Sequence, residues 1–320
     1  MRAIVIDEFG GPDVLQVREV DDPKPGDGEV VVRLHAAGVN PVETYQRSGS
    51  QGYNRPLPFT PGADGAGVVE AVGAGVERVT AGDRVYTAGS KTGTYAELAL
   101  CGADQVHPLP QSLSFEEGAC LWINYGTAYR ALFQRGAARS GERVLIHGAT
   151  GGVGVAAVQW ARYRGLDLYA TFGSAEGRTL LAEHGVAKLF SHRDENHGAQ
   201  ILEATGGEGV DLVVEMLANV NLEADLDMLA RGGRVVVVGS RGTIEITPRK
   251  LMGREADVRG LMLGKAAPEE TTEIHAMIAA AGANGALRPV IQKTLPLREA
   301  PEAHRAVMDD PSHGKIVLLP

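Results

Sequence analysis

The chain has 320 residues, which is too long for one ordinary hydrophobic core and predicts about two domains. Apolar residues make up 44% of the sequence, so its 42 glycines and 16 prolines indicate a globular chain rich in turns. Collagen and disorder are excluded by that composition. The net charge of −9 disfavours non-specific binding to nucleic acid or to an anionic membrane.

Cysteine content and the absence of long apolar runs bear on location. Cys101 and Cys120 are the two cysteines, too few for a disulfide framework or a four-cysteine zinc site, and this favours a reducing compartment. Asp7 and Glu8 interrupt the N-terminal segment before a signal-peptide core can form. Apolar runs never reach the roughly 18 residues that a membrane helix needs. We therefore expect a cytoplasmic globular protein.

Residues 1 to about 115 carry short alternating apolar runs, such as 30–35 and 83–86, between clusters of Gly and Pro. This pattern predicts a mostly β region with many turns. A helix is predicted to start at Ser114, because Glu117 three residues later completes a capping box. We expect this helix to mark a domain boundary.

Strand candidates then recur at intervals of one helix, beginning near Arg143, Asp167, Lys188, Val210, Arg234 and Asp257. Parallel neighbours need crossovers of that length, so the spacing predicts βαβ units. The continuous apolar run 235–238 is typical of a strand buried on both faces. The fold class is therefore α/β: a mostly β domain and a doubly wound, six-stranded parallel sheet.

The last fifty residues are predicted to hold two helices, at about 268–281 and 299–309, and a closing strand at 315–319. This segment is too small to fold alone, so we expect it to complete the first domain. The predicted domains are 1–118 with 264–320, and 119–263.

A glycine-rich loop, 148–154, joins the apolar strand at 143–147 to a predicted helix. The pyrophosphate of a dinucleotide binds to backbone N–H groups at such a helix N-terminus, where side chains would be in the way. Two registers fit, A-x-G-x-x-G at 149–154 and G-x-G-x-x-A at 152–157. We prefer the first, because it places Gly154 inside the helix for close packing on the sheet.

The end of the second strand of this sheet indicates which dinucleotide is bound. NAD sites carry Asp or Glu there to hold the ribose 2′-hydroxyl, whereas this chain has Gly173. Ser174 and Arg178 follow and suit a 2′-phosphate, so NADPH is predicted in preference to NADH. His192, after the third strand, lies on the same edge. For Arg178 and His192 the alternative is an ordinary surface position.

Five segments carry a resemblance to a known family: 35–45, 60–67, 148–154, 215–221 and 232–246. The chain resembles zeta-crystallin and related quinone oxidoreductases of the medium-chain dehydrogenase/reductase superfamily. The resemblance covers nearly the whole chain. It implies a GroES-like catalytic domain and a Rossmann domain, with the active site in the cleft between them. It further implies NADPH-dependent reduction of ortho- or para-quinones, in a homodimer joined through residues 258–263 or in a tetramer.

The resemblance also implies a set of cofactor contacts. They are Tyr45, Thr150, Gly151, Gly152, Val153, Gly173, His192, Asn221, Val238, Gly239, Ser240, Arg241, Leu261, Met262 and Leu263. Segments that follow the fifth and sixth strands are physically suited to this role, since ligands bind at the carboxyl ends of parallel strands.

Zinc is not predicted. The zinc-dependent branch of the superfamily has Cys where this chain has Asn40, and Gly-His-Glu where it has residues 62–64, so two ligands are missing. Reduction of a quinone depends less on a Lewis acid than reduction of a simple ketone does, because the reduced quinone is aromatic and delocalises the negative charge. Asn40, Tyr45 and Tyr53 are the candidate catalytic contacts. Their structural alternatives are a turn residue, a packed helix aromatic and a loop anchor.

Two alternative functions are carried forward. One is NADPH-dependent reduction of α,β-unsaturated ketones on the same scaffold. The other is a secondary role in binding single-stranded RNA, against which the charge of −9 argues. The sequence does not decide between transfer of a whole hydride and one-electron steps that give semiquinones.

Overall fold

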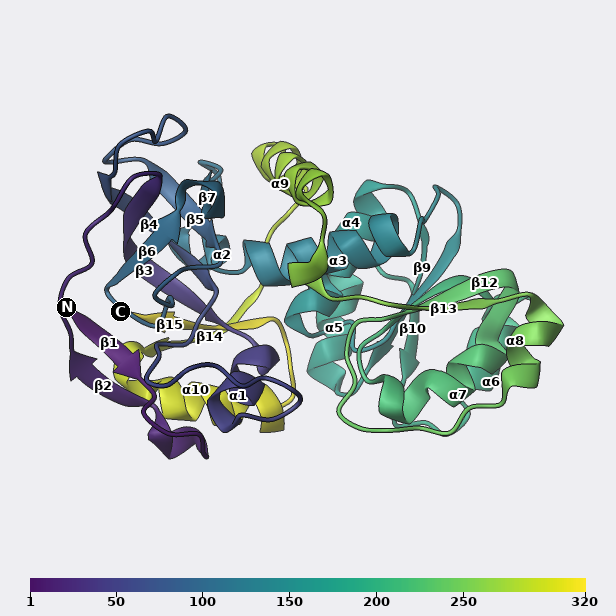
Figure 1. The fold of residues 1–320 in the computed structure, drawn as a ribbon. Coiled ribbons are helices and arrows are strands. Elements are labelled where there is room, and N and C mark those ends of the chain that lie inside the picture. The colour runs from purple at the N-terminus through teal and green to yellow at the C-terminus, as the bar shows by residue number, and fades with distance from the viewer. The chain divides into compact units, whose positions relative to one another are not determined.

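The computed structural model describes residues 1–320 and consists of two compact units (Figure 1). The first unit comprises Met1–Ile123 and Ile278–Pro320, and the second comprises Asn124–Met277. The first unit is therefore built from two separate stretches of chain. The domain bounds 1–118 with 264–320, and 119–263, stay a prediction.

A seven-stranded sheet forms the centre of the first unit, in the order β14-β15-β3-β4-β5-β7, with β6 also paired to β3. A separate pair, β1-β2, lies beside it. The strands are β1 Arg2–Val5, β2 Gln16–Glu19, β3 Glu29–Val39, β4 Asp64–Val72, β5 Arg84–Ala88, β6 Leu98–Gly102, β7 Val106–Pro108, β14 Ile291–Pro296 and β15 Lys315–Leu319. The mostly β character predicted for the first 115 residues is confirmed.

The helices of the first unit are short and pack around this sheet. They are α1 Pro41–Ser48, α2 Phe115–Gly118 and α10 Ala300–Asp309, with 3₁₀ turns at Pro12–Val14, Ala103–Gln105 and Leu297–Glu299. Ser114 caps α2 as predicted: its Oγ accepts from Glu117 N at 3.2 Å, and its N–H donates to Glu117 Oε2 at 2.7 Å. The alanine face of α10 packs with Ile4, Ile316 and Leu318 in one buried cluster.

All six strands of the second unit are parallel, in the order β10-β9-β8-β11-β12-β13. They are β8 Arg143–Ile146, β9 Asp167–Phe172, β10 Lys188–Ser191, β11 Val210–Glu215, β12 Leu229–Val237 and β13 Asp257–Gly260. Five begin at the predicted residues. β12 begins earlier, at Leu229, because the chain pairs with Val210 before a register irregularity brings Arg234 opposite Leu212. The doubly wound sheet is confirmed.

Helices connect these strands. They are α4 Gly152–Tyr163, α5 Ala175–Glu183, α6 His197–Ala204, α7 Ala218–Met228 and α8 Pro248–Arg254. Before β8 stands α3 Thr127–Tyr129, between π-helical turns at Leu121–Gly126 and Arg130–Arg135. After β13 come a 3₁₀ turn at Leu263–Lys265 and α9 Pro268–Ala283, whose residues from Ile278 on belong to the first unit. The sheet core joins Leu145, Tyr169 and Val213 to Ile201 of α6 and Leu222 of α7. None of the helices is both long enough and apolar enough to cross a membrane.

Candidate functional site

The glycine loop of the second unit leads from β8 directly into α4. Gly151 is the N-cap of α4, in extended conformation, and has no side chain to accept from the first turn. The first N–H groups of a helix have no intrahelical acceptor, so this turn presents unpaired donors and the positive end of the helix dipole. Such a terminus fits a phosphate group.

Two glycines of this loop have close neighbours, a side chain at Gly152 and backbone at Gly154, and the backbone contact is the one that requires glycine. A Cβ on Gly152 would lie 2.3 Å from Asn124 Nδ2, and one on Gly154 would lie 2.2 Å from the Gly148 carbonyl oxygen. Gly154 lies inside α4, as the preferred register predicts, but its close neighbours are Gly148 and Ala149 of the loop rather than a strand of the sheet. The loop is thus a tight cradle of backbone, which fits a dinucleotide pyrophosphate.

The carboxyl ends of β9 and β10 bring together the residues predicted to select the cofactor. Gly173 follows β9 directly, and a Cβ there would lie 2.6 Å from His192 Cε1, so the two are in contact. Ser174 caps α5 by accepting from Gly177 N at 3.0 Å, and Arg178 lies exposed on the same helix. No carboxylate stands at the position where an NAD site needs one.

The remaining predicted cofactor contacts of the second unit follow neighbouring strands of the same sheet edge. Asn221 lies on α7, which follows β11, whereas 238–241 follow β12 and 261–263 follow β13. The backbone N–H of Arg241 donates to Asn219 Oδ1 at 2.7 Å, which fixes the segment after β12 against the start of α7. The topology therefore brings these segments together, as a doubly wound sheet requires.

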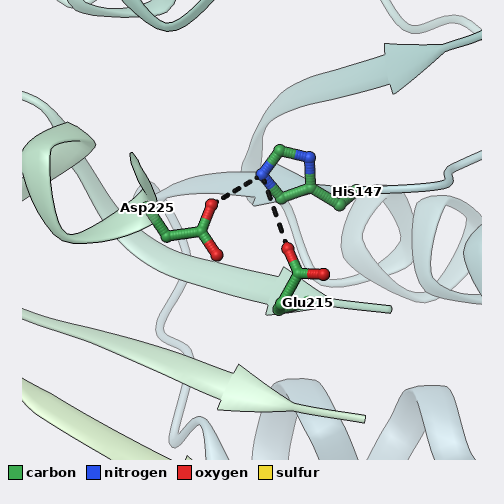
Figure 2. Close-up of side chains that lie close together, drawn as sticks. All are labelled: His147, Glu215 and Asp225. Carbon is green, nitrogen blue, oxygen red and sulfur yellow. Dashed lines mark hydrogen bonds and ion pairs between the residues drawn. The ribbon is translucent and has the colours of Figure 1, made fainter. Parts of the chain in front are cut away.

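Three buried titratable side chains lie at this edge and were not predicted from the sequence. His147 Nε2 is 2.9 Å from Asp225 Oδ1 and 3.7 Å from Glu215 Oε2. Figure 2 shows that both carboxyl groups face the same ring nitrogen of His147. His147 follows β8 directly, Glu215 ends β11 and Asp225 lies on α7, so their separation along the chain hides the cluster. The only available signal was polar residues at the ends of apolar strands.

A metal ion does not fit this cluster well, although its donor atoms lie within 4.8 Å of one another. The Leu217 N–H and the Asn221 amide both donate to the Glu215 carboxylate, and they would face a bound cation. Burial raises the pKa of Glu215 and of Asp225 to about 7, and it lowers the pKa of His147. The cluster is therefore better suited to holding a proton.

In the first unit, Asn40 stands at the N-cap of α1 and is 2% exposed. Its backbone N–H donates to Glu43 Oε2 at 2.6 Å, and its amide nitrogen donates to Glu43 Oε1 and Asp64 Oδ2, each at 3.1 Å. Its amide oxygen accepts from Lys315 Nζ, which also lies 3.0 Å from Asp64 Oδ2. The amide of Asn40 is thus fully engaged within the protein.

Catalytic zinc does not fit this arrangement. The amide of Asn40 stands in place of one possible ligand. The Asp64 carboxylate already faces the buried ammonium of Lys315, the first residue of β15. A zinc ion at this carboxylate would be repelled by that ammonium. The thiols of the two free cysteines hydrogen-bond to backbone carbonyls elsewhere and not to Asn40, Asp64 or Lys315. A buried ammonium and an amide at these positions do not suit a zinc ion.

The network continues away from Asn40 through other buried groups. Tyr95 donates its hydroxyl proton to Glu43 Oε2 at 2.9 Å and lies 3.2 Å from His304 Nε2, whose Nδ1 is 3.2 Å from Arg47 Nη1. Burial raises the pKa of Glu43 to about 7 and lowers the pKa of His304 to about 3. His304 is therefore neutral at physiological pH, and Arg47 supplies the positive charge.

Tyr45 and Tyr53, the other candidate catalytic residues, lie together. Their rings are stacked with centroids 6.4 Å apart, and both side chains are half-buried. Tyr45 projects from α1, and Tyr53 lies in the segment that follows it. The structure thus joins two of the three predicted catalytic residues to each other, while Asn40 belongs to the buried network.

Comparisons with known proteins match this architecture over the whole chain. The alcohol dehydrogenase GroES-like domain family matches residues 26–111, and the zinc-binding dehydrogenase family matches residues 152–280. The quinone oxidoreductase of Homo sapiens is 46% identical over 100% of this chain and 98% of its own length.

Two solved structures cover 100% of this chain and are themselves covered in full. The quinone oxidoreductase of Escherichia coli complexed with NADPH is 32% identical, with a TM-score of 0.91. An NAD-dependent alcohol dehydrogenase is 30% identical, with a TM-score of 0.93. The resemblance to zeta-crystallin and its relatives is confirmed, and the chain belongs to the quinone oxidoreductase family of the medium-chain dehydrogenase/reductase superfamily.

Proposed function

We propose that this protein is a zinc-independent, NADPH-dependent oxidoreductase that reduces quinones. The observation that carries the proposal is its 46% identity, over its full length, to a human quinone oxidoreductase. The glycine cradle at α4 and the residues after β9 support the choice of cofactor. Bound NADPH would supply the two reducing electrons.

The residues that would hold the cofactor are those of the second unit's sheet edge. The N–H groups of Gly152 and Val153 and the side chain of Thr150 would bind the pyrophosphate, beside Gly151, whose own N–H donates to the Gly148 carbonyl. Asn221 with 238–241 and 261–263 would bind the nicotinamide half. Both an NADPH-bound and an NAD-dependent relative share this fold at similar TM-scores, so the fold alone does not select the cofactor. The selection falls to Gly173, Ser174, Arg178 and His192.

In the first unit we propose that Tyr45 and Tyr53 contact the substrates. Their stacked, half-buried rings offer flat apolar surface and two hydroxyl groups, which suits a planar quinone. We propose Tyr45 as a cofactor contact as well. Asn40, whose amide is engaged with Glu43, Asp64 and Lys315, would act by holding the start of α1 in place.

A substrate panel tests the function. We expect purified protein to oxidise NADPH with 1,2- and 1,4-quinones and to do so without added or bound metal. Turnover of α,β-unsaturated ketones with none of the quinones would replace the proposal by the enone reductase alternative. Activity that follows stoichiometric zinc would contradict the metal-free site.

Arg178→Ala tests the proposed 2′-phosphate site. Loss of a charge-assisted hydrogen bond is expected to weaken NADPH binding about tenfold or more and to leave NADH binding nearly unchanged. Titration of each cofactor by fluorescence measures both affinities. The matched control is Arg249→Ala, which removes an exposed arginine from a different helix, α8, and should change neither affinity. Equal losses for NADPH and NADH in Arg178→Ala would remove Arg178 from the site.

We propose a homodimer formed through β13, the edge strand of the parallel sheet. An open strand edge is usually paired or protected, and Val258 and Met262 expose apolar side chains beside this one. Light scattering should give twice the chain mass, or four times if dimers pair further, and Val258→Lys should give monomer. A wild-type monomer at micromolar concentration would contradict the proposed dimer.

The two free, buried cysteines suit a cytoplasmic location, which we also propose.

A further inference from the structure

We infer that Glu215 is a positioning residue for the cofactor: it orients Asn221 so that the amide oxygen of Asn221 faces the ligand, within a buried network that includes His147 and Asp225. The inference rests on the proposed cofactor site. It adds a residue that does not itself contact the ligand, and it states which atom of Asn221 does so.

The contacts of Asn221 lead to this orientation. Its amide nitrogen donates to both oxygens of Glu215, at 3.1 and 3.3 Å. With the donor end of the amide held by the carboxylate, the acceptor end is left for a ligand. Asn221 is therefore set to accept a hydrogen bond from an N–H group, such as the carboxamide of a nicotinamide.

Glu215 also fixes the two turns on either side of Asn221's helix. Its carboxylate accepts from the Leu217 N–H, at the turn into α7. Its backbone carbonyl accepts from Val238 N at 2.8 Å and Gly239 N at 3.3 Å, after β12. Glu215 thus contacts two of the segments that are proposed to hold the cofactor, Asn221 through its side chain and 238–239 through its backbone. Replacing the side chain therefore acts on the cofactor site through Asn221.

His147 connects Glu215 to the glycine loop. The Gly148 N–H donates to Thr171 Oγ1 at 3.2 Å, and that oxygen lies 3.3 Å from His147 Nδ1. In the neutral tautomer that carries its proton on Nε2, Thr171 donates to Nδ1 and His147 donates to Asp225 Oδ1, which is 2.9 Å away. Every close contact of the ring is then satisfied without a positive charge.

The two carboxyl groups consequently have no buried cation to neutralise them. Glu215 and Asp225 are both fully buried, and Asp225 Oδ2 has no hydrogen-bond partner. The other titratable groups nearby are histidines: His197 of α6 lies edge-on to His147 at 6.4 Å, and His192 is exposed beyond it. The two carboxyl groups have oxygens within 4.8 Å of each other, so they titrate as a pair, and we infer that one proton held by the pair relieves the repulsion between them.

The pH dependence follows from this shared proton. Burial raises the pKa of both carboxyl groups to about 7, so the proton is present below that pH and is lost above it. Two buried carboxylates repel each other, and the repulsion would displace Glu215 from Asn221. NADPH affinity should therefore fall as the pH rises through about 7.

A double-mutant cycle tests the positioning role, with NADPH affinity measured by titration on the intact protein. We expect Glu215→Met and Asn221→Ala each to weaken NADPH binding about tenfold. The double variant should be no weaker than either single variant, because Glu215 acts through Asn221. Additive losses, or unchanged affinity in Glu215→Met, would overturn the inference.

The pH profile provides a second test with variants that keep the shape of the site. Wild-type affinity, measured from about pH 6 to about pH 9, should fall more steeply than that of Glu215→Gln or Asp225→Asn. Titration of the cofactor phosphate and of His192 is common to all three proteins and cancels in the comparison. Identical profiles would contradict the shared proton. A wild-type protein that binds no NADPH at any pH would instead refute the proposed function.

Discussion

Replacing Lys315 by methionine should lower the free energy of unfolding by about 3–5 kcal/mol, because it leaves the Asp64 carboxylate buried without its cation. Lys315 and Asp64 side chains are 4% and 1% exposed, so water cannot take the place of the ammonium group. Asp64 would retain only its neutral donors, the Ile123 N–H at 2.9 Å and the Asn40 amide at 3.1 Å. Urea unfolding followed by circular dichroism measures the loss.

The control for this prediction is the double variant Lys315→Met/Asp64→Asn, which removes both charges together. It should recover most of the lost stability, because a neutral pair carries no uncompensated buried charge. Amide hydrogen exchange should locate the damage in β4 and β15, which carry the two residues. A single variant that loses less than about 1 kcal/mol would show that the ion pair contributes little.

Gly154→Ala should prevent NADPH binding at a concentration that saturates the wild type and destabilise the second unit. The added Cβ would lie 2.2 Å from the Gly148 carbonyl oxygen and 2.6 Å from Ala149 Cα, so backbone must move. Helix propensity favours alanine by about 1 kcal/mol, but overpacking of this kind costs about 1–3 kcal/mol. The expected balance is a net loss of stability, with the loop displaced from the helix terminus.

Gly253→Ala is the matched control, since Gly253 is also a helical glycine of the second unit. A Cβ there meets nothing within 4 Å, so alanine should stabilise α8 by up to about 1 kcal/mol and leave NADPH affinity unchanged. Thermal unfolding and NADPH titration of both variants separate the two cases. Normal binding by Gly154→Ala would show that the cradle does not hold the cofactor.

Much of the fold could be predicted from the sequence because its signals are local and periodic. The starts of the parallel strands follow from one-helix spacing, and the cap at Ser114 follows from a pattern four residues long. The glycine loop is likewise a contiguous motif, and its context after β8 and before α4 is confirmed. The early start of β12 at Leu229 was not visible, because it depends on pairing with Val210 across the sheet.

The buried polar networks could not be predicted, since each joins residues that are distant in sequence. Lys315, on the last strand, contacts Asn40 and Asp64. Asp225, on α7, contacts His147, which directly follows β8, far earlier in the chain. A lone Lys at a strand start reads as a surface residue, and a lone Asp in a helix reads the same way. Only the fold brings such charges together and reveals their partners.

The position of β15 in the sheet has a consequence for how the protein is made. Val317 of β15 pairs with Gly38 of β3 (Figure 1). β3 is synthesised early, and this pairing can form only after β15, near the C-terminus, has been synthesised. The second unit, whose chain is continuous, can fold while the ribosome is still translating the remainder. Until β15 emerges, the end of β3 at 37–39 lacks its partner strand and Asp64 lacks its ammonium partner. The nascent first unit is therefore the stage at which chaperones would be needed most, and premature termination before Lys315 would leave it permanently in that state.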